Sequence, residues 1–407
     1  MRKTFCIIFL IIFILCSPTV LNTKNEEPQN VVKFASWGSQ SEIKILKQLL
    51  SDFEEQTKIK VIFSHIPQNY FQKIHLLFAS NLAPDVIFIN NHYLKMYTDA
   101  NLLEDLTYLL DKKETYYKTS IDCLSDNNKI YAIPRDISNL VIYVNKDILK
   151  KENIKYKTKI TSLQELKSIA TKLSNKEHYG INFEEDSLYW LYFLGANGGG
   201  ILSDDTKDLK IKESNSINAL NLYSDFANKY NIAPTKAKIG SMTTAQMFIN
   251  GKLAMYLGGR WMIPKFRETI SFNWDIVEFP SSKKNKIFVD ASGWAIAKQS
   301  KNKENAVKLI MFLSSYESIN KLAESGLIIP ARKTNAEAFI NTEKGKKPTH
   351  SEIFINMLEN AKPTPVNKHY GRINDILREN LQSVLSGEEK TENALDDKTI
   401  KKLEGLL

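Results

Sequence analysis

The chain has 407 residues, of which 43% are hydrophobic and 25% are charged, a composition typical of a globular protein with room for two domains. Its formal net charge is +9, but lysines alternate with acidic residues along the whole length, as in Lys112-Lys113-Glu114. Charge dispersed in this way indicates a solvated surface. These properties argue against a nucleic-acid-binding protein, and we predict no nucleic-acid partner.

The N-terminus has the pattern of a secretory signal peptide over residues 1–16. Arg2 and Lys3 provide a positive start, and the apolar stretch that follows is too short for a membrane span. Cys16 ends this stretch, and we predict that it becomes the lipidated first residue of a lipoprotein. A secreted form cut near Ser17 to Thr23 and an uncleaved anchor are the alternatives. Residues 17–30 are polar and contain prolines, which predicts a flexible tether.

The cysteine count excludes a disulfide framework. The sequence contains three cysteines, and Cys6 and Cys16 both belong to the predicted leader. Cys123 is therefore left without a partner in the mature chain.

After the tether, strands and helices alternate. Short apolar strands are predicted at 31–36, 61–63 and 86–89, with amphipathic helices at 43–53 and 70–79 between them. This alternation is typical of a parallel α/β sheet. In such sheets ligands bind at the carboxyl ends of strands. Residues at or near these ends are Trp37, Asp85, Asn90 and Asn91.

The middle of the chain begins a second lobe. A strand is predicted at 140–144 and a helix at 162–173, opened by the capping box Ser162-Leu-Gln-Glu165. An apolar segment follows at 188–194. Gly198 to Gly200 lack the lysine and hydroxyl of a phosphate-binding loop, and we predict a loop at the rim of a cleft. The helical, polar sequence from Thr334 onward is predicted to pack on the second lobe.

Enzyme signatures are missing from the sequence. It contains no metalloprotease, nucleophile-elbow or Walker motif, and the six histidines lack metal-ligand spacing. The acidic run Glu184-Glu185-Asp186 is interpreted as a charged surface rather than a glycosidase pair. We therefore predict a protein that is not an enzyme and has neither a cofactor nor a metal.

Aromatic residues instead indicate a sugar-binding cleft. Aromatic rings stack on the apolar face of a sugar, and carboxylate, amide and guanidinium groups bind its hydroxyls. The alternative for each ring is the hydrophobic core, which we favour for Trp274. Candidate platforms are Trp37, Tyr70, Trp190, Trp261 and Trp294, and candidate polar partners are Asp85, Asn139, Asn145 and Arg260.

Five motifs occur in an order that characterises one family. They are Pro84-Asp85-Val86, Tyr143-Val144-Asn145-Lys146-Asp147, Ala254-Met255 with Gly258 and Trp261, Ser292-Gly293-Trp294, and Pro330-Ala331-Arg332. Together they resemble the family 1 extracellular solute-binding proteins of ABC importers, the maltose-binding-protein-like group. The resemblance covers about residues 31 to 340. Val144 and Ser292 depart from the family, which more often has tyrosine and glycine there.

The resemblance implies an α/β, two-lobed type II periplasmic-binding-protein fold with the ligand cleft between the lobes. The first lobe is predicted to comprise 31–136 and 289–331, and the second 137–288 and 332–407. Three crossings near 134–140, 284–291 and 328–334 are expected to act as hinges. The implied ligand-binding residues are Trp37, Tyr70, Asp85, Asn91, Asn139, Trp190, Gly259, Arg260, Trp261, Gly293, Trp294 and Arg332.

The implied function is the capture of a sugar or oligosaccharide for an ABC permease. The protein is then expected to be an extracytoplasmic monomer, held at the membrane by a lipid on Cys16. Two alternatives stay open. One is a binder of a glycerol phosphodiester, polyamine or peptide, and the other is a sensor or adhesin on the same fold.

Overall fold

The computed structural model describes residues 30–110 and 112–407. The predicted signal peptide, the lipidation site at Cys16 and nearly all of the predicted tether lie outside the described residues. Among the residues that are described, no helix has the length and apolar character needed to cross a membrane.

A seven-stranded sheet forms the centre of the first lobe. Its strands run in the order β11-β6-β10-β3-β1-β2, and β12 pairs with one end of β10. β1 is parallel to both β2 and β3, so the predicted parallel arrangement is confirmed, whereas β10 is antiparallel to β3 and β6. The strands are β1 (Val31–Ser36), β2 (Lys60–His65), β3 (Val86–Asn90), β6 (Ile133–Ser138), β10 (Ile287–Ile296), β11 (Ile329–Pro330) and β12 (Ala361–Pro363).

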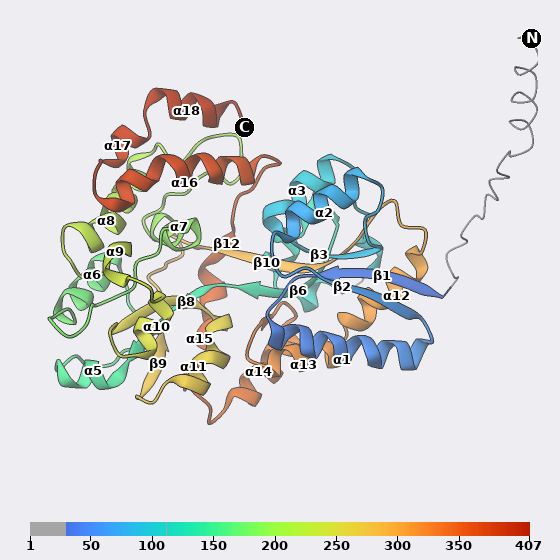
Figure 1. Ribbon diagram of the computed structural model, residues 1–407, viewed down its shortest axis with the longest axis horizontal. Coiled ribbons are helices and arrows are strands. Elements are labelled where there is room, and N and C mark those ends of the chain that lie inside the picture. Colours follow the sequence, from blue (N-terminus) through green and yellow to red (C-terminus); the bar gives the residue numbers. More distant parts are fainter. Residues whose placement is uncertain (1–29, 111) are drawn as a thin grey trace, which may run out of the picture.

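Helices cover both faces of this sheet (Figure 1). The first helix begins where the side chain of Ser39 accepts a hydrogen bond from the Glu42 amide, and its apolar face is buried from Ile43 to Phe53. This face is the one predicted from helical spacing. The helices of this lobe are α1 (Gln40–Thr57), α2 (Tyr70–Ala79), α3 (Asn91–Asp99), α4 (Lys118–Cys123), α12 (Lys303–Leu313), α13 (Tyr316–Glu324) and α14 (Lys333–Glu343).

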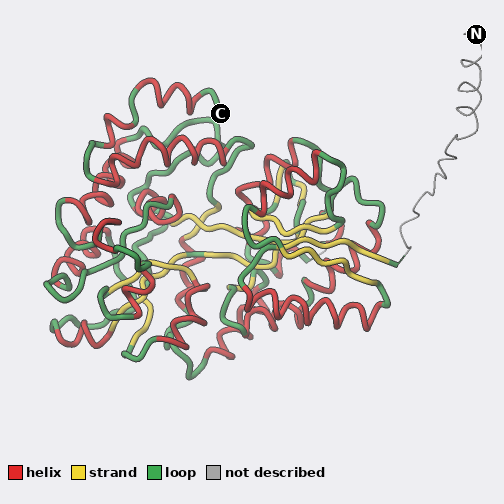
Figure 2. Tube along the Cα trace, in the orientation of Figure 1, coloured by secondary structure: helices red, strands yellow, loops and turns green. Residues whose placement is uncertain are grey.

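The second lobe contains a three-stranded antiparallel sheet in the order β8-β7-β9. Its strands are β7 (Leu140–Asn145), β8 (Met255–Gly259) and β9 (Trp274–Val277). Helices surround this sheet, and Figure 2 shows the strands inside and the helices outside in both lobes. The helices are α5 (Lys146–Lys151), α6 (Leu163–Lys172), α7 (Ser187–Ala196), α8 (Ser214–Asn228), α9 (Lys236–Ile239), α10 (Thr244–Ile249), α11 (Ile263–Thr269), α15 (Ile353–Asn356), α16 (Tyr370–Ser386), α17 (Thr391–Ala394) and α18 (Asp397–Glu404).

Six short elements complete the described chain. They are η1 (Thr107–Leu109), η2 (Lys113–Thr115), β4 (Ser125–Asp126), β5 (Lys129–Ile130), η3 (Arg260–Met262) and η4 (Met357–Asn360).

The predicted capping box at the start of α6 is half correct. The Ser162 side chain accepts a hydrogen bond from the Glu165 amide at 3.1 Å. The Glu165 carboxylate does not return to Ser162, because it accepts from the amide and hydroxyl of Thr161 at 2.8 and 2.7 Å.

Two hydrophobic cores are joined by three strand segments. In β6, Ile133 belongs to the core of the first lobe and Ile137 to that of the second. The same change occurs in β10 between Val289 and Ala291, and next to β11 between Ile328 and Ile329. The change of core therefore falls within the second and third predicted crossings and begins one residue before the first.

The prediction for the C-terminal part is wrong for its first helix. Phe339 of α14 lies in the core of the first lobe, and Asn335 donates hydrogen bonds to Tyr316 and Asn320 of α13. Apolar residues of α14 face α13, so the chain stays on the first lobe until Glu343. From Ile353 onward the buried residues belong to the second core, as predicted.

Candidate functional site

A cavity of about 820 Å³ lies between the two lobes. This volume is within the range that small-molecule sites usually have. Residues of both lobes line it, and they are Trp37, Gly38, Ser39, Ser41, Glu42, Phe88, Asn90, His92, Arg135, Asp136, Ile137, Ser138, Asp186, Ser187, Leu188, Leu191, Arg260, Trp261, Pro264, Lys265, Asp290, Ala291, Ser292, Leu327, Ile328, Ile329 and Tyr370.

The first-lobe wall is built at the carboxyl ends of β1 and β3. Trp37 follows β1, and the turn into α1 places Glu42 beside it. Asn90 ends β3, and His92 lies in the first turn of α3. This wall is where parallel strands were expected to place a ligand.

The second-lobe wall combines three helix starts. Asp186 caps α7, and its Oδ1 accepts a hydrogen bond from the Leu188 amide at 2.8 Å. Trp261 projects from the short turn η3 that follows β8, and Tyr370 begins α16. Trp37 and Trp261 are 47% and 40% exposed, so the cavity has one accessible indole from each lobe.

A buried ionic network forms the floor of the cavity. Arg135 Nη1 donates to Glu42 Oε1 at 2.6 Å, and Arg135 Nε donates to Asp136 Oδ2 at 2.8 Å. Asp136 also accepts a hydrogen bond from the Ser292 hydroxyl at 2.6 Å. Burial disfavours the charge on Arg135, but the two carboxylates more than compensate and raise its pKa. Its positive charge is thereby neutralised within the protein.

A second ionic pair lies between the lobes at His92. Its Nε2 is 2.8 Å from Asp290 Oδ1, and its ring stands 5.1 Å from that of Tyr370. Burial opposes protonation of His92, but Asp290, with Asp186 further away, raises its pKa overall. Burial acts against the charge of Asp290 as well, yet His92 and Asn91 lower its pKa. Both effects favour the charged pair.

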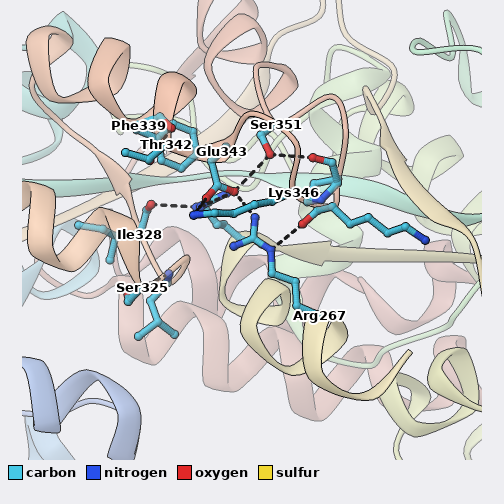
Figure 3. Close-up of polar contacts among 12 residues, drawn as sticks. Arg267, Ser325, Ile328, Phe339, Thr342, Glu343, Lys346 and Ser351 are labelled. Carbon is cyan, nitrogen blue, oxygen red and sulfur yellow. Dashed lines mark hydrogen bonds and ion pairs between the residues drawn. The ribbon is translucent and has the colours of Figure 1, made fainter. Parts of the chain in front are cut away.

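Arg260 is part of the cavity lining but is almost fully buried and paired within the protein. The residue is 2% exposed, and its Nε donates to the Ile328 carbonyl at 3.0 Å. Its Nη2 lies 3.2 Å from Glu343 Oε2. Arg267 contacts the same carboxylate oxygen (Figure 3). Burial lowers the pKa of Arg260 to about 10, so the guanidinium remains charged at neutral pH.

Three of the predicted site residues line the cavity, and several others are buried elsewhere. Trp37, Arg260 and Trp261 are among the lining residues. Trp190 and Trp294 are 2% and 0% exposed and belong to the second and first cores, which corrects their predicted position in the cleft. Trp274 is buried, as expected.

Two other predicted site residues form hydrogen bonds away from the cavity. The Tyr70 hydroxyl donates to the carbonyls of Ala35 and Phe88. Asp85 accepts hydrogen bonds from the Ser300 hydroxyl and the Lys33 amide. These side chains hold strands and loops of the first lobe together, so their predicted position in the cleft is wrong.

Four further residues support the site from behind or lie apart from it. Asn139 donates to the Phe354 carbonyl at 2.8 Å, and Asn91 donates to Asp290 Oδ1 at 2.9 Å. Arg332 donates to the Tyr116 hydroxyl at 2.7 Å. Asn145 accepts hydrogen bonds from the amides at the start of α5. None of the four is among the residues that line the cavity.

The predicted glycines also lie outside the cavity lining. Gly259 ends β8, and Gly293 is paired on both sides within β10. The glycine run after α7 is not at the cavity rim either, because Gly199 packs against Ser216 of α8.

The sequence analysis missed most of the charged residues of the cavity. One available signal was the pair Arg135-Asp136, which interrupts an otherwise apolar crossing strand. Buried charges are rarely tolerated without partners, so this pair pointed to a polar cluster. The missed charged or titratable residues are Glu42, His92, Arg135, Asp136, Asp186, Lys265 and Asp290, and the aromatic Tyr370 was missed as well. Within the described ranges, no group of three histidine, cysteine, aspartate or glutamate residues is placed to hold a metal ion.

Comparison with known proteins identifies the family. Residues 48–350 match the family model described as bacterial extracellular solute-binding protein. The chain belongs to this family. The resemblance seen in the motifs is therefore confirmed, and the family is one of binding proteins rather than enzymes.

Curated relatives are similar over most of their length. The galactooligosaccharide-binding protein of Bacillus subtilis is 21% identical over 362 residues, which cover 83% of this chain and 84% of the relative. The maltodextrin-binding protein of the same organism is 23% identical over 303 residues, which cover 70% of this chain and 70% of the relative.

Solved structures confirm the two-lobed fold. An ABC substrate-binding protein of Listeria monocytogenes in complex with cycloalternan has a TM-score of 0.83 at 23% identity, with coverage of 92% of this chain and 98% of that chain. A Mycobacterium tuberculosis protein in complex with glycerophosphocholine has a TM-score of 0.78 at 16% identity, with coverage of 91% and 97%. At such identities the similarity concerns the fold.

Proposed function

We propose that the protein is the extracytoplasmic solute-binding component of an ABC importer, and that it binds a sugar or oligosaccharide between its lobes for delivery to a permease. The observation that carries this proposal is the pair of exposed indoles, Trp37 and Trp261, on opposite walls of one cavity. Indoles stack on sugar rings, and the carboxylates and hydroxyls of the floor suit a ligand rich in hydroxyl groups. The names of the curated relatives agree with this ligand class.

The charges of the cavity favour an uncharged solute over a phosphodiester. Arg135 is neutralised by Glu42 and Asp136, and the guanidinium of Arg260 faces Glu343 behind the wall. Lys265 lies exposed at the rim and forms no ion pair among the described residues. An anionic ligand would therefore meet carboxylates without a free buried cation, which costs binding energy.

Binding at this position would couple to closure of the lobes. A solute that contacts both walls is held best when the lobes approach each other, so it shifts the population toward the closed form. A shift from 1:99 to 99:1 needs about 5.5 kcal/mol. Micromolar affinity corresponds to about 8 kcal/mol, which is sufficient, and a permease can then recognise the closed shape.

The finer features of the protein belong to the same proposal. We infer that Cys16 carries a lipid, that the protein acts as a monomer without enzymatic activity, and that the lobes comprise 31–136 with 289–343 and 137–288 with 353–407. The ligand-binding residues are proposed to be Trp37 and Trp261, with Glu42, His92, Asp136 and Asp186 as polar partners.

Thermal unfolding against a panel of solutes tests the proposal. A ligand that binds the folded state at a hundredfold excess over Kd raises stability by about 2.7 kcal/mol. We expect a shift with maltooligosaccharides or galactooligosaccharides and none with glycerol phosphodiesters, polyamines or peptides. A shift confined to charged solutes or peptides would overturn the assignment to sugars.

A further inference from the structure

Glu343 lies at the centre of a buried ionic cluster that joins the two lobes. It is the last residue of α14, which packs on the first lobe, and it is 3% exposed. Its carboxylate contacts Arg267 of α11 and Arg260 of η3, both on the second lobe. Figure 3 shows Arg267 and Ser351 on either side of Glu343. The Ser351 hydroxyl donates a further hydrogen bond to it at 3.4 Å.

Arg260 connects this cluster to the solute cavity. Its guanidinium lies 4.0 Å from the ring centroid of Phe339 in the first core and 5.4 Å from that of Phe354 in the second. Its Nε is bound to the carbonyl of Ile328, in the third crossing. The next residue, Trp261, is 40% exposed and lines the cavity. The buried arginine therefore anchors the short turn that presents the indole.

The cluster depends on the carboxylate for its charge balance. Burial raises the pKa of Glu343, but Arg260 and Arg267 outweigh this effect and lower it overall, so the group is ionised at neutral pH. Without that charge, two guanidinium groups would face each other, and Arg260 is almost fully buried. Buried charges without a partner rearrange or admit water, and here the rearrangement would displace the turn at Trp261.

We propose that Glu343 is a positioning residue for solute binding, which holds Arg260 and thereby fixes both Trp261 in the cavity wall and the second lobe against the third crossing. Glu343 does not line the cavity, so it acts through Arg260 rather than by contact with the solute. The effect on affinity rests on the proposed function, whereas the effect on Trp261 does not.

Tryptophan quenching measures the position of Trp261 without any ligand. Of the five tryptophans, Trp190, Trp274 and Trp294 are at most 2% exposed. In a Trp37→Phe background, acrylamide quenching therefore reports on Trp261. Glu343→Gln keeps the size of the side chain and removes its charge, and we expect a larger quenching constant because the indole loses its fixed position.

Asp275→Asn is the matched control. Asp275 is a fully buried carboxylate of the second lobe that binds His350 at 2.8 Å and lies outside the cavity lining. Its substitution is expected to lower stability but to leave the quenching of Trp261 unchanged. Equal quenching in Glu343→Gln and in this control would overturn the proposal. If Glu343→Gln does not fold, Glu343→Asp is used instead, because it keeps the negative charge but moves it away from Arg260. An unchanged quenching constant of Trp261 in Glu343→Asp would also overturn the proposal.

Affinity is then measured by calorimetry with maltotriose as the probe, in proteins that retain Trp37. We expect Kd to rise about tenfold in Glu343→Gln, because Glu343 acts through Arg260 on the indole, and to stay within about twofold in Asp275→Asn. An unchanged Kd in a folded Glu343→Gln protein would contradict a positioning role. If the unaltered protein fails to bind any oligosaccharide, the sugar assignment fails, while the quenching result still decides the role of Glu343.

Discussion

Trp261 and Trp294 follow similar glycine-containing motifs but have opposite environments. Trp261 is 40% exposed at the cavity, whereas Trp294 is completely buried in the first core. The difference arises from what the strand does after the glycine. β8 ends at Gly259, and the chain turns into η3, whereas β10 continues beyond Gly293 and pairs with both β3 and β6. In this protein, the glycine that precedes an aromatic residue is followed by an exposed ring only where the strand ends.

The two glycines serve different neighbours. A Cβ atom at Gly259 would lie 2.0 Å from the ring of Trp261, so this glycine makes room for the cavity indole. A Cβ atom at Gly293 would lie 2.2 Å from the carbonyl oxygen of Ile133 in β6, so that glycine permits close strand pairing. One position thus belongs to the site and the other to the sheet.

The largest expected effect is the loss of stability in Trp294→Ala. Trp294 packs edge-on against Phe34 with centroids 5.3 Å apart, and its removal would leave a large void in the core. We expect the free energy of unfolding, measured by urea denaturation, to fall by about 3–5 kcal/mol. A loss below about 1 kcal/mol would show that the ring is not a core residue.

Trp261→Ala should weaken ligand binding but leave the stability of the protein nearly unchanged. Truncation of an aromatic anchor typically weakens binding by about 2 kcal/mol or more, or roughly thirtyfold in Kd. Because the side chain is partly exposed, we expect the free energy of unfolding to change by less than about 0.5 kcal/mol. Calorimetry with an oligosaccharide and urea denaturation measure the two effects separately. Unchanged affinity would remove Trp261 from the site.

Substitutions of the two glycines test the same contrast between cavity and core, with smaller expected effects. Gly259→Ala pushes the Trp261 ring away from its preferred rotamer, which costs of order 0.5–1.5 kcal/mol, so we expect Kd to rise by up to about tenfold. Gly293→Ala should instead reduce stability, because the obstructing atom is backbone. Melting temperature and Kd, determined for both variants, distinguish these outcomes, and a loss of stability in Gly259→Ala with unchanged Kd would contradict the assignment.

The smallest expected effect concerns pH. The pKa of His92 is raised in the folded state, so its pair with Asp290 stabilises the fold fully below about pH 6.5. This stabilisation is lost as pH rises through the raised pKa of His92. Because the pKa of Asp290 is lowered, it is also lost under strongly acidic conditions.

His92→Gln should remove this pH dependence. We expect the unaltered protein to exceed the variant in stability by at most about 1 kcal/mol near pH 5 and by nothing near pH 9. Urea denaturation at the two pH values measures the difference. If the difference in the free energy of unfolding is the same at both pH values, His92 acts by packing against Tyr370 rather than by its charge.

Local patterns were sufficient to predict the first three strands of the first lobe and the two helices between them. The strand at Val31–Ser36 and the helix at Tyr70–Ala79 have the predicted bounds, because both depend on the spacing of nearby apolar residues. The family motifs led to the two-lobed fold and to the three crossings. Both predictions rest on short runs of contiguous residues, which can be interpreted without knowing which distant residues they contact.

The floor of the cavity was not predictable in the same way. Glu42 and Arg135 are 93 positions apart, and Asp136 and Ser292 are 156 apart. Such pairs form only after the strands have found their register, which no local pattern encodes. The exposure of Trp261 and the burial of Trp294 likewise depend on strand pairing, so the two indoles were indistinguishable in the sequence.

The most direct test of the central claim is acrylamide quenching of the unaltered protein with and without a saturating oligosaccharide that calorimetry shows to bind. Among the five tryptophans, only Trp37 and Trp261 are appreciably exposed, and both line the cavity of the proposed site, one from each lobe. The account predicts that the bound sugar shields both indoles and lowers the quenching constant. An unchanged quenching constant in the fully bound protein would contradict it, because the sugar would then lie outside the cavity between the lobes.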